Sequence, residues 1–217
     1  MVGKTGKGLL LISGGFDSPV AGLLMKKQGM IIDAIHFSLE PVTDDTAERK
    51  CMELARVLGL DRLFVVKIGD ELAQIAARCT RRYYFVLSKR FMIRVAQRVA
   101  EKEGYGCLVT GENLGQVSSQ TLQNLTVIDS AARIPVLRPL LGFDKQEIIS
   151  ISKEGGMYEI SKGPEICDAL GPETPSTAAA LPAILEEEAK SDMGALIEDA
   201  IAKLKVVEAG PPKEAVA

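Results

Sequence analysis

The stretch that decides the fold of this chain is Leu9-Leu10-Leu11-Ile12-Ser13-Gly14-Gly15-Phe16-Asp17-Ser18-Pro19-Val20-Ala21. Four consecutive aliphatic residues predict a strand that is buried on both faces, as in a parallel sheet. Two glycines then allow a sharp turn, and Asp17 or Ser18 is expected to cap the helix that begins next. A strand, a tight loop and a helix N-terminus together favour phosphate binding, because free backbone N–H groups and the positive end of the helix dipole meet there.

Strands and helices alternate along the chain that follows. Further strands are expected at 31–37, 63–66, 107–110 and 135–138. Helices are expected at 17–28, at 43–58, from 69 past 98 with a break near Thr80, through Gln116 to Gln123, and at 144–154. This alternation predicts βαβ units, and therefore an α/β fold with a five-stranded parallel sheet and helices on both faces.

Four polar or glycine positions lie at the expected carboxyl ends of these strands. They are Ser13, His36, Gly111 and Arg138. Ligands of parallel sheets bind at that edge, where the strand order reverses. We therefore expect the functional site there.

The composition of the chain changes after Gly163. Gly163-Pro164, Gly171-Pro172 and Pro175 interrupt regular structure, and an Ala/Glu-rich segment follows from 177 to about 207. We interpret 1–176 as one phosphate-loop domain and 177–217 as a helical extension with a tail, packed on the outside of that domain or on a partner.

Several classes of protein are disfavoured by composition. The sequence has no apolar run of membrane-spanning length and no signal-peptide core, so a cytoplasmic protein without membrane contact is expected. Its cysteines are far apart and form no C-x-x-C pair, which argues against a zinc finger and against a disulfide framework. The formal net charge of −3 does not by itself indicate nucleic-acid binding.

One window is strongly basic. Between Arg78 and Arg98 there are seven basic residues and no acidic one. Arg90, Arg94 and Arg98 recur at four-residue spacing and would form a stripe along a helix. Two interpretations stay open, a surface for RNA phosphates and an ordinary solvated helix face.

The loop sequence Ser13-Gly14-Gly15-Phe16-Asp17-Ser18 resembles the SGGxDS pyrophosphate loop of the N-type ATP pyrophosphatases. Two further phrases resemble one branch of that superfamily, the tRNA 4-thiouridine synthetases or tRNA sulfurtransferases, which are also linked to thiamine thiazole synthesis. They are Val109-Thr110-Gly111-Glu112-Asn113-Leu114-Gly115-Gln116-Val117-Ser118-Ser119-Gln120-Thr121-Leu122, and Leu137-Arg138-Pro139-Leu140 with Asp144-Lys145. The likeness covers roughly Leu9 to Thr177.

This resemblance implies a fold of the adenine nucleotide α-hydrolase type, with the strand order 3-2-1-4-5, and an ATP-dependent enzyme. ATP would be cleaved to AMP and pyrophosphate with Mg²⁺, and a tRNA uridine would be adenylated on the way to 4-thiouridine. The catalytic residues implied are Asp17, which would also hold the metal, Lys145 and Cys167, the last in sulfur delivery. The ATP-binding residues implied are Leu11, Ile12, Ser13, Gly14, Gly15, Asp17, Ser18, His36, Phe37, Lys89, Gly111 and Gln120.

Several of these residues also have a simpler interpretation. Asp17 would serve as a helix cap, His36 as a buried structural histidine, and Lys145 as a solvated lysine in a first helical turn. Leu11 and Ile12 would be plain core residues of a strand.

The resemblance also bears on partners and on alternatives. Members of the family usually carry a THUMP domain, which this sequence lacks, so we expect tRNA to be presented by a separate THUMP-type protein and sulfur to come from a separate donor. Some relatives have a C-x-x-C where Phe85 and Ser88 stand here, which argues against an iron–sulfur cluster, although Cys79 and Cys167 leave an unusual one open. A homodimer stays open too.

Two rival functions stay open as well. They are an ATP-binding module without chemistry and a ligase of the same superfamily acting on a small molecule.

Overall fold

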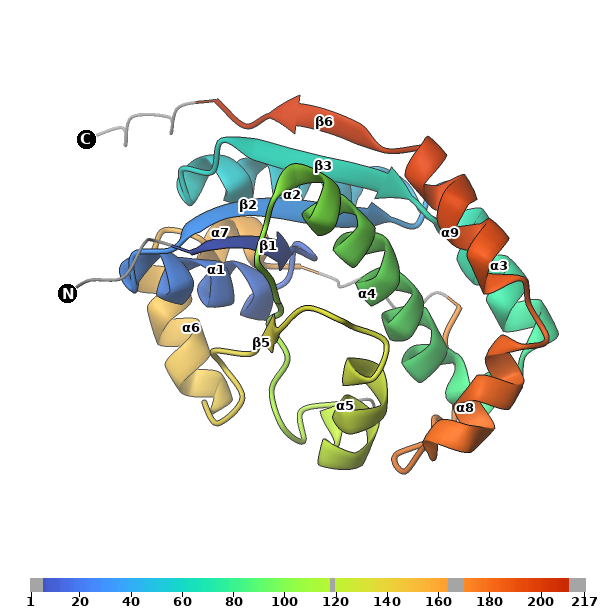
Figure 1. Cartoon of the computed structure of the whole chain (residues 1–217). Coiled ribbons are helices and arrows are strands. Elements are labelled where there is room, and N and C mark those ends of the chain that lie inside the picture. Colours follow the sequence, from blue (N-terminus) through green and yellow to red (C-terminus); the bar gives the residue numbers. More distant parts are fainter. Residues whose placement is uncertain (1–5, 118–119, 164–169, 211–217) are drawn as a thin grey trace.

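A sheet in the order β5-β4-β1-β2-β3-β6 runs through the computed structural model of the chain (Figure 1). The structure describes residues 6–117, 120–163 and 170–210. Its strands in that part of the chain are β1 (Lys7–Leu11), β2 (Ile31–Ser38), β3 (Arg62–Lys67), β4 (Cys107–Val109), β5 (Val136–Leu137) and β6 (Lys205–Glu208). The first five strands are parallel, so the predicted α/β fold and the order 3-2-1-4-5 are confirmed.

The sixth strand was not predicted. β6 pairs antiparallel with β3, with Arg62 opposite Glu208 and Val65 opposite Lys205. The sheet is therefore six-stranded in the described residues and only mostly parallel, and the helical interpretation of the segment up to 207 is wrong at its end. Val206 and Val207 are β-branched, which suits a strand better than a helix.

Helices cover both faces of the sheet (Figure 1). α1, α2, α6 and α7 pack on one face, and α3, α4, α5, α8 and α9 pack on the other. Their bounds are α1 (Asp17–Lys27), α2 (Thr46–Val57), α3 (Gly69–Arg78), α4 (Tyr84–Glu103), α5 (Leu122–Asp129), α6 (Lys145–Glu154), α7 (Tyr158–Ser161), α8 (Leu181–Glu188) and α9 (Met193–Ala202), with the short 3-10 helix η1 at Arg81–Tyr83. No helix among the described residues is both long and apolar enough to span a membrane.

Two expectations about helices have different outcomes. The predicted break near Thr80 is confirmed, because α3 ends at Arg78 and η1 separates it from α4. The predicted polar helix through Gln116 is wrong at its start, since α5 begins only at Leu122. Thr121 is its N-cap and accepts a hydrogen bond from the Asn124 N–H, which fixes the helix start there.

The core explains why the first strand is aliphatic throughout. Leu9 packs into the hydrophobic cluster on the α4 face, whereas Leu10 packs into the cluster on the α1 face, because successive side chains of a strand point to opposite sides. Both are fully buried. β1 lies at the centre of the sheet, and its carboxyl end leads directly into the Ser13–Ser18 loop.

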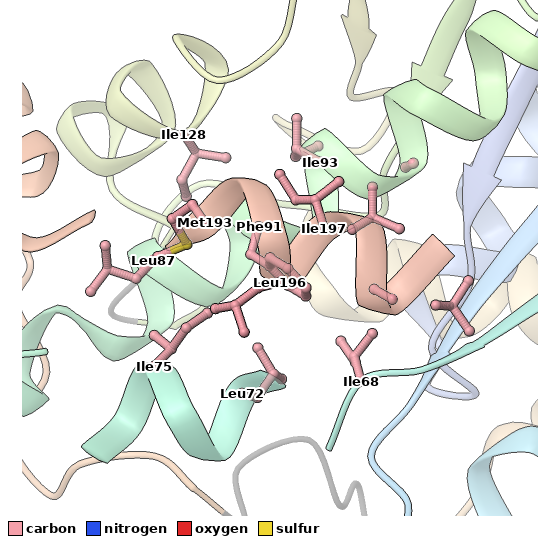
Figure 2. Close-up of a cluster of buried hydrophobic side chains, with 14 of the residues drawn as sticks. Ile68, Leu72, Ile75, Leu87, Phe91, Ile93, Ile128, Met193, Leu196 and Ile197 are labelled. Carbon is pink, nitrogen blue, oxygen red and sulfur yellow. The ribbon is translucent and has the colours of Figure 1, made fainter. Parts of the chain in front are cut away.

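The segment after 177 belongs to the core of the described structure. Figure 2 shows Met193, Leu196 and Ile197 of α9 packed against apolar side chains from α3 and α4, among them Leu72, Ile75, Leu87 and Phe91. This segment therefore supplies both β6 and part of the α4-face cluster. The division of the chain at 176 stays a prediction.

The basic stripe on α4 faces the acidic residues of α8 and α9. Arg90 is 1% exposed, and its Nε donates to Glu188 Oε1 over 2.8 Å. Arg94 reaches Glu188 Oε2 over 2.8 Å, and Arg98 pairs with Glu198 over 2.8 Å. Because Arg90 is buried, both the RNA-contact prediction and the solvated-face interpretation are wrong for this residue. The side chains of Arg94 and Arg98 are 27% and 47% exposed, and their contact with RNA stays a prediction.

Replacing Glu188 with alanine is expected to lower the free energy of unfolding by about 3–5 kcal/mol, because a buried guanidinium would lose its counter-ion. Chemical denaturation of the full chain measures this change. The matched control is Glu198→Ala, which breaks the exposed pair with Arg98 and should cost less than about 1 kcal/mol. Equal effects of the two substitutions would contradict the assignment of Arg90 as an ion-paired core residue.

Candidate active site

The Ser13–Ser18 loop closes on itself through hydroxyl groups. The Ser13 N–H donates to Ser18 Oγ over 3.0 Å, and the two hydroxyl oxygens lie 3.2 Å apart. Gly14 has a φ of +74°, a conformation that favours glycine. The predicted side-chain cap by Asp17 or Ser18 is wrong, because Phe16 occupies the N-cap position without a side-chain cap bond. Ser18 instead fixes the turn that precedes α1.

Gly111 brings the end of β4 into contact with this loop. A Cβ atom placed on Gly111 would lie 2.5 Å from the Ser18 nitrogen and 2.6 Å from the Asp17 carbonyl carbon. Only a residue without a side chain allows this approach. Gly111 is therefore the predicted site residue that the structure joins most directly to the loop.

A charged network lies just beyond Gly111. The Glu112 carboxylate accepts hydrogen bonds from Lys89 Nζ over 2.7 Å and from Arg138 Nε over 2.8 Å. Arg138 also binds Asp129 at 2.6 Å, so four segments of the chain meet here. Burial raises the pKa of Glu112, but the two cations outweigh it and hold that pKa below its usual value. Lys89 is thus oriented by Glu112, which follows the predicted Gly111 directly and was not singled out from the sequence.

His36 lies at the carboxyl end of β2 with its ring on the α2 side. Its Nδ1 is 3.1 Å from the Ile12 carbonyl oxygen and 3.2 Å from Cys51 Sγ, and its Nε2 has no hydrogen-bond partner among the described residues. Burial lowers the pKa of His36 to about 4, although the bond to Ile12 opposes the shift. The ring is therefore neutral at pH 7. Phe37 points to the other face, into the α4 cluster.

The other predicted strand residues are already engaged in the sheet. The Ile12 N–H donates to the Ile35 carbonyl over 2.9 Å, and Leu11 packs against the α4-face cluster. Gln120 is 9% exposed, and its Oε1 has no hydrogen-bond partner in the described part of the chain. Its backbone carbonyl accepts from the Gly115 N–H over 3.1 Å, which closes the 115–120 loop.

The two remaining predicted catalytic residues are Lys145 and Cys167. Lys145 is exposed at the first position of α6, behind the N-cap Asp144, as its simpler interpretation expected. Cys167 lies outside the described residues. The chain that leads to it is nevertheless anchored on the loop, because Ser161 Oγ donates to the Gly15 carbonyl over 3.2 Å. Lys50 Nζ likewise donates to the Lys162 carbonyl over 3.0 Å.

The family model described as "Thiamine biosynthesis protein (ThiI)" matches residues 3–193. The chain belongs to this family. It is 41% identical over 216 residues to a "Probable tRNA sulfurtransferase" from Coxiella burnetii, covering 95% of the chain and 54% of that relative. A relative with the same name from Alkaliphilus oremlandii is 43% identical over 211 residues, with 94% and 54% covered. The chain thus spans about half the length of the curated relatives it matches.

A solved structure supports the same grouping. The chain is similar to one described as a 4-thiouridine synthetase–RNA complex with bound ATP, with a TM-score of 0.88 and 38% identity, over 93% of this chain and 55% of that one. A U34-tRNA thiolase from Methanococcus maripaludis has a TM-score of 0.57 at 16% identity, a likeness of fold alone. The ThiI-family chain therefore shares both sequence and backbone with the 4-thiouridine synthetase over nearly its whole length.

A magnesium ion fits the donor set of the loop. Asp17 is a half-buried carboxylate at the first position of α1, beside backbone N–H groups suited to phosphates. Mg²⁺ is bound in many nucleotide sites by one or two carboxylates together with substrate phosphates. Asp17 is the residue of this ThiI-family chain that would hold the ion.

His36 is expected to stay neutral down to about pH 4. It is the only histidine of the chain, so its ring C–H resonance in an NMR titration is unambiguous. Because the unfolded chain protonates near pH 6.5 and the folded chain does not, the free energy of unfolding should fall between pH 7 and pH 5, by at most about 1.4 kcal/mol per pH unit. A ring that titrates near pH 6.5 in the folded protein would contradict the buried geometry.

Glu112→Gln is expected to lower the free energy of unfolding by about 2–3 kcal/mol, because Lys89 and Arg138 would lose a charged hydrogen-bond acceptor. Denaturant titration measures the change. Glu40→Gln is the control, since Glu40 pairs with the more exposed Lys67 and should cost less than about 1 kcal/mol. If Glu112→Gln lowers the free energy of unfolding by no more than Glu40→Gln does, the network around Glu112 does not organise the site.

Proposed function

We propose that this chain performs the ATP-dependent activation step of a tRNA sulfurtransferase. ATP is cleaved to AMP and pyrophosphate, and a tRNA uridine is adenylated for conversion to 4-thiouridine. The observation that carries the proposal is the Ser13–Ser18 loop at the carboxyl end of β1, closed by Ser18 and contacted by Gly111, in a member of the ThiI family. The names of the curated relatives and the ATP and RNA of the similar synthetase structure support it.

The loop binds the phosphates of ATP. The N–H groups at the start of α1 and the positive end of its dipole favour an anion. Asp17 holds Mg²⁺, which when bound would neutralise charge on the phosphates. Lys89, oriented by Glu112, adds a cation at the same edge of the sheet.

The chemistry requires activation because the C4 oxygen of uridine is a poor leaving group. In the proposed step, that oxygen attacks the α-phosphorus of ATP and pyrophosphate departs with the cleaved bond's electrons. Lys145 is the cation proposed to offset the charge that develops on the departing group. A sulfur nucleophile then attacks C4, and AMP leaves with the former C4 oxygen.

Cys167 is proposed to carry this sulfur as a persulfide. Support comes from the anchoring of Ser161 and Lys162 beside the loop, only a few residues before Cys167. The terminal sulfur attacks C4 as the thiolate form of a persulfide, which leaves a disulfide between Cys167 and the base. An external thiol reductant then attacks Cys167 Sγ, which releases 4-thiouridine and leaves a mixed disulfide, and a second equivalent of the thiol returns Cys167 to its reduced form. The sulfur donor and a THUMP-type protein that presents tRNA are separate partners, and the reaction takes place in the cytoplasm.

The test is pyrophosphate release from ATP with Mg²⁺, unmodified tRNA, a persulfide sulfur donor and a THUMP-type protein. Asp17→Asn should reduce the rate by about 100-fold or more and Lys145→Ala by about 10–100-fold, since each removes charge stabilisation from the departing pyrophosphate. Lys153→Ala on the same helix is the control and should leave the rate unchanged. Cys167→Ser should keep pyrophosphate release and abolish 4-thiouridine, as read by nucleoside mass spectrometry.

Two results would overturn the proposal. ATP that binds without any pyrophosphate release would favour a binding module, and release that depends on a small-molecule acceptor instead of tRNA would favour a ligase. Full 4-thiouridine formation by Cys167→Ser would remove only the role of that cysteine.

A further inference from the structure

The peptide group between Gly15 and Phe16 lies in the middle of the Ser13–Ser18 loop and is weakly fixed by its own backbone. Gly15 has no Cβ atom, so rotation about its backbone bonds is little restricted and the peptide group can turn over. The carbonyl of Gly15 also receives no bond from the residue four positions later, because that residue is Pro19 and has no N–H. The orientation of this peptide group therefore has to be set from outside the loop.

Ser161 at the end of α7 supplies that contact. Its side chain is buried, with 1% of the residue exposed, and its Oγ donates to the Gly15 carbonyl oxygen over 3.2 Å. Gly15 is buried as well. A hydrogen bond between two buried groups is costly to break, because water does not replace the lost partner. The Gly15 carbonyl is therefore held toward α7.

The helix α7 is itself fixed to the surroundings of the loop. The ring of Tyr158 lies 5.3 Å from the ring of Phe16, centre to centre. Lys50 Nζ on α2 donates to the Lys162 carbonyl over 3.0 Å, directly after Ser161. Met157 before the helix is fully buried, and Ile160 packs against the same hydrophobic cluster on the α1 face. The Ser161 hydroxyl therefore has a defined position relative to the loop.

The bond to Ser161 determines the direction of the Phe16 N–H. In a trans peptide group the C=O and the N–H point in opposite directions, and the cis bond of the described residues is Glu40–Pro41. With the Gly15 carbonyl held toward α7, the Phe16 N–H points away from that helix. It donates to no group in the described part of the chain. A free N–H at the N-cap of α1 is a donor suited to an anion.

We propose that Ser161 is a positioning residue for the phosphates of ATP, an inference that rests on the proposed function. Ser161 touches no phosphate itself. It keeps the peptide group of Gly15 and Phe16 in the orientation that presents an N–H to a phosphate oxygen. A peptide group turned the other way would present the Gly15 carbonyl oxygen, and an attraction would be replaced by a repulsion.

The Phe16 amide can be observed directly in the full chain. Labelling with ¹⁵N-phenylalanine gives six amide signals, one for each phenylalanine, and Phe16→Leu identifies the signal of residue 16. Pyrophosphate added with Mg²⁺ should shift this amide proton downfield and slow its exchange with water, because the N–H gains a charged acceptor. The shift should be lost in Ser161→Ala.

Affinities measured by calorimetry distinguish positioning from a general structural role. Ser161→Ala should raise the Kd for ATP and for pyrophosphate about 10-fold, the loss of one hydrogen bond to a charged group. The Kd for adenosine should stay unchanged, because adenosine has no phosphate. Ser152→Ala is one control, since this buried serine of α6 has no hydrogen-bond partner for its Oγ among the described residues. Ile160→Val is the other, because it weakens the packing of α7 and keeps the Ser161 hydroxyl. Both controls should keep all three Kd values.

The outcomes separate this inference from the proposed function. Unchanged Kd values for ATP and pyrophosphate in Ser161→Ala, or an equal rise of the Kd for adenosine, would overturn the positioning role. If Ser161→Ala does not fold, the wild-type spectrum decides, and a Phe16 amide that pyrophosphate neither shifts nor protects would overturn it. A wild-type chain that binds ATP without releasing pyrophosphate would contradict the proposed function alone, whereas one that binds neither ATP nor pyrophosphate would contradict both.

Discussion

The approach of Gly111 to the first turn of α1 is the constraint on which the site depends. It brings the end of β4 within contact of the Ser13–Ser18 loop, at a distance that any side chain on residue 111 would prevent. Glu112 follows directly, so the same approach sets where the carboxylate that binds Lys89 and Arg138 can lie. The Ser13–Ser18 loop and the charged network around Glu112 come from distant parts of the sequence, and the absence of a Cβ atom at Gly111 allows them to meet.

Local patterns were enough to predict the central part of this arrangement. The aliphatic run before Ser13 and the glycines after it identify a buried strand and a turn, and both are confirmed. The alternation of strands and helices predicted a parallel sheet, whereas the strand order came from the fold type of the family that the loop resembles. The identity of the loop came from resemblance to a family, and the family match supports it.

What the sequence did not reveal depends on contacts between distant residues. The stripe of Arg90, Arg94 and Arg98 looked available because its acidic partners, Glu188 and Glu198, come about a hundred residues later. The strand β6 could not be predicted from local sequence either. Its four residues follow a helical segment, and they form a strand because they pair with β3. The role of Glu112 depends on Arg138, which is brought to it by the pairing of β4 with β5. A basic side chain therefore indicates a binding surface only when the folded structure shows that no acidic side chain pairs with it.

The central claim is that ATP activates the C4 oxygen of a tRNA uridine. Tracing that oxygen with ¹⁸O tests it most directly. With tRNA labelled at the uridine C4 oxygen, Mg²⁺, ATP and a sulfur source, the account predicts that the label leaves in AMP, in an amount equal to the 4-thiouridine formed. Unlabelled AMP that has instead taken its oxygen from solvent water would mean simple hydrolysis of ATP and would contradict the account.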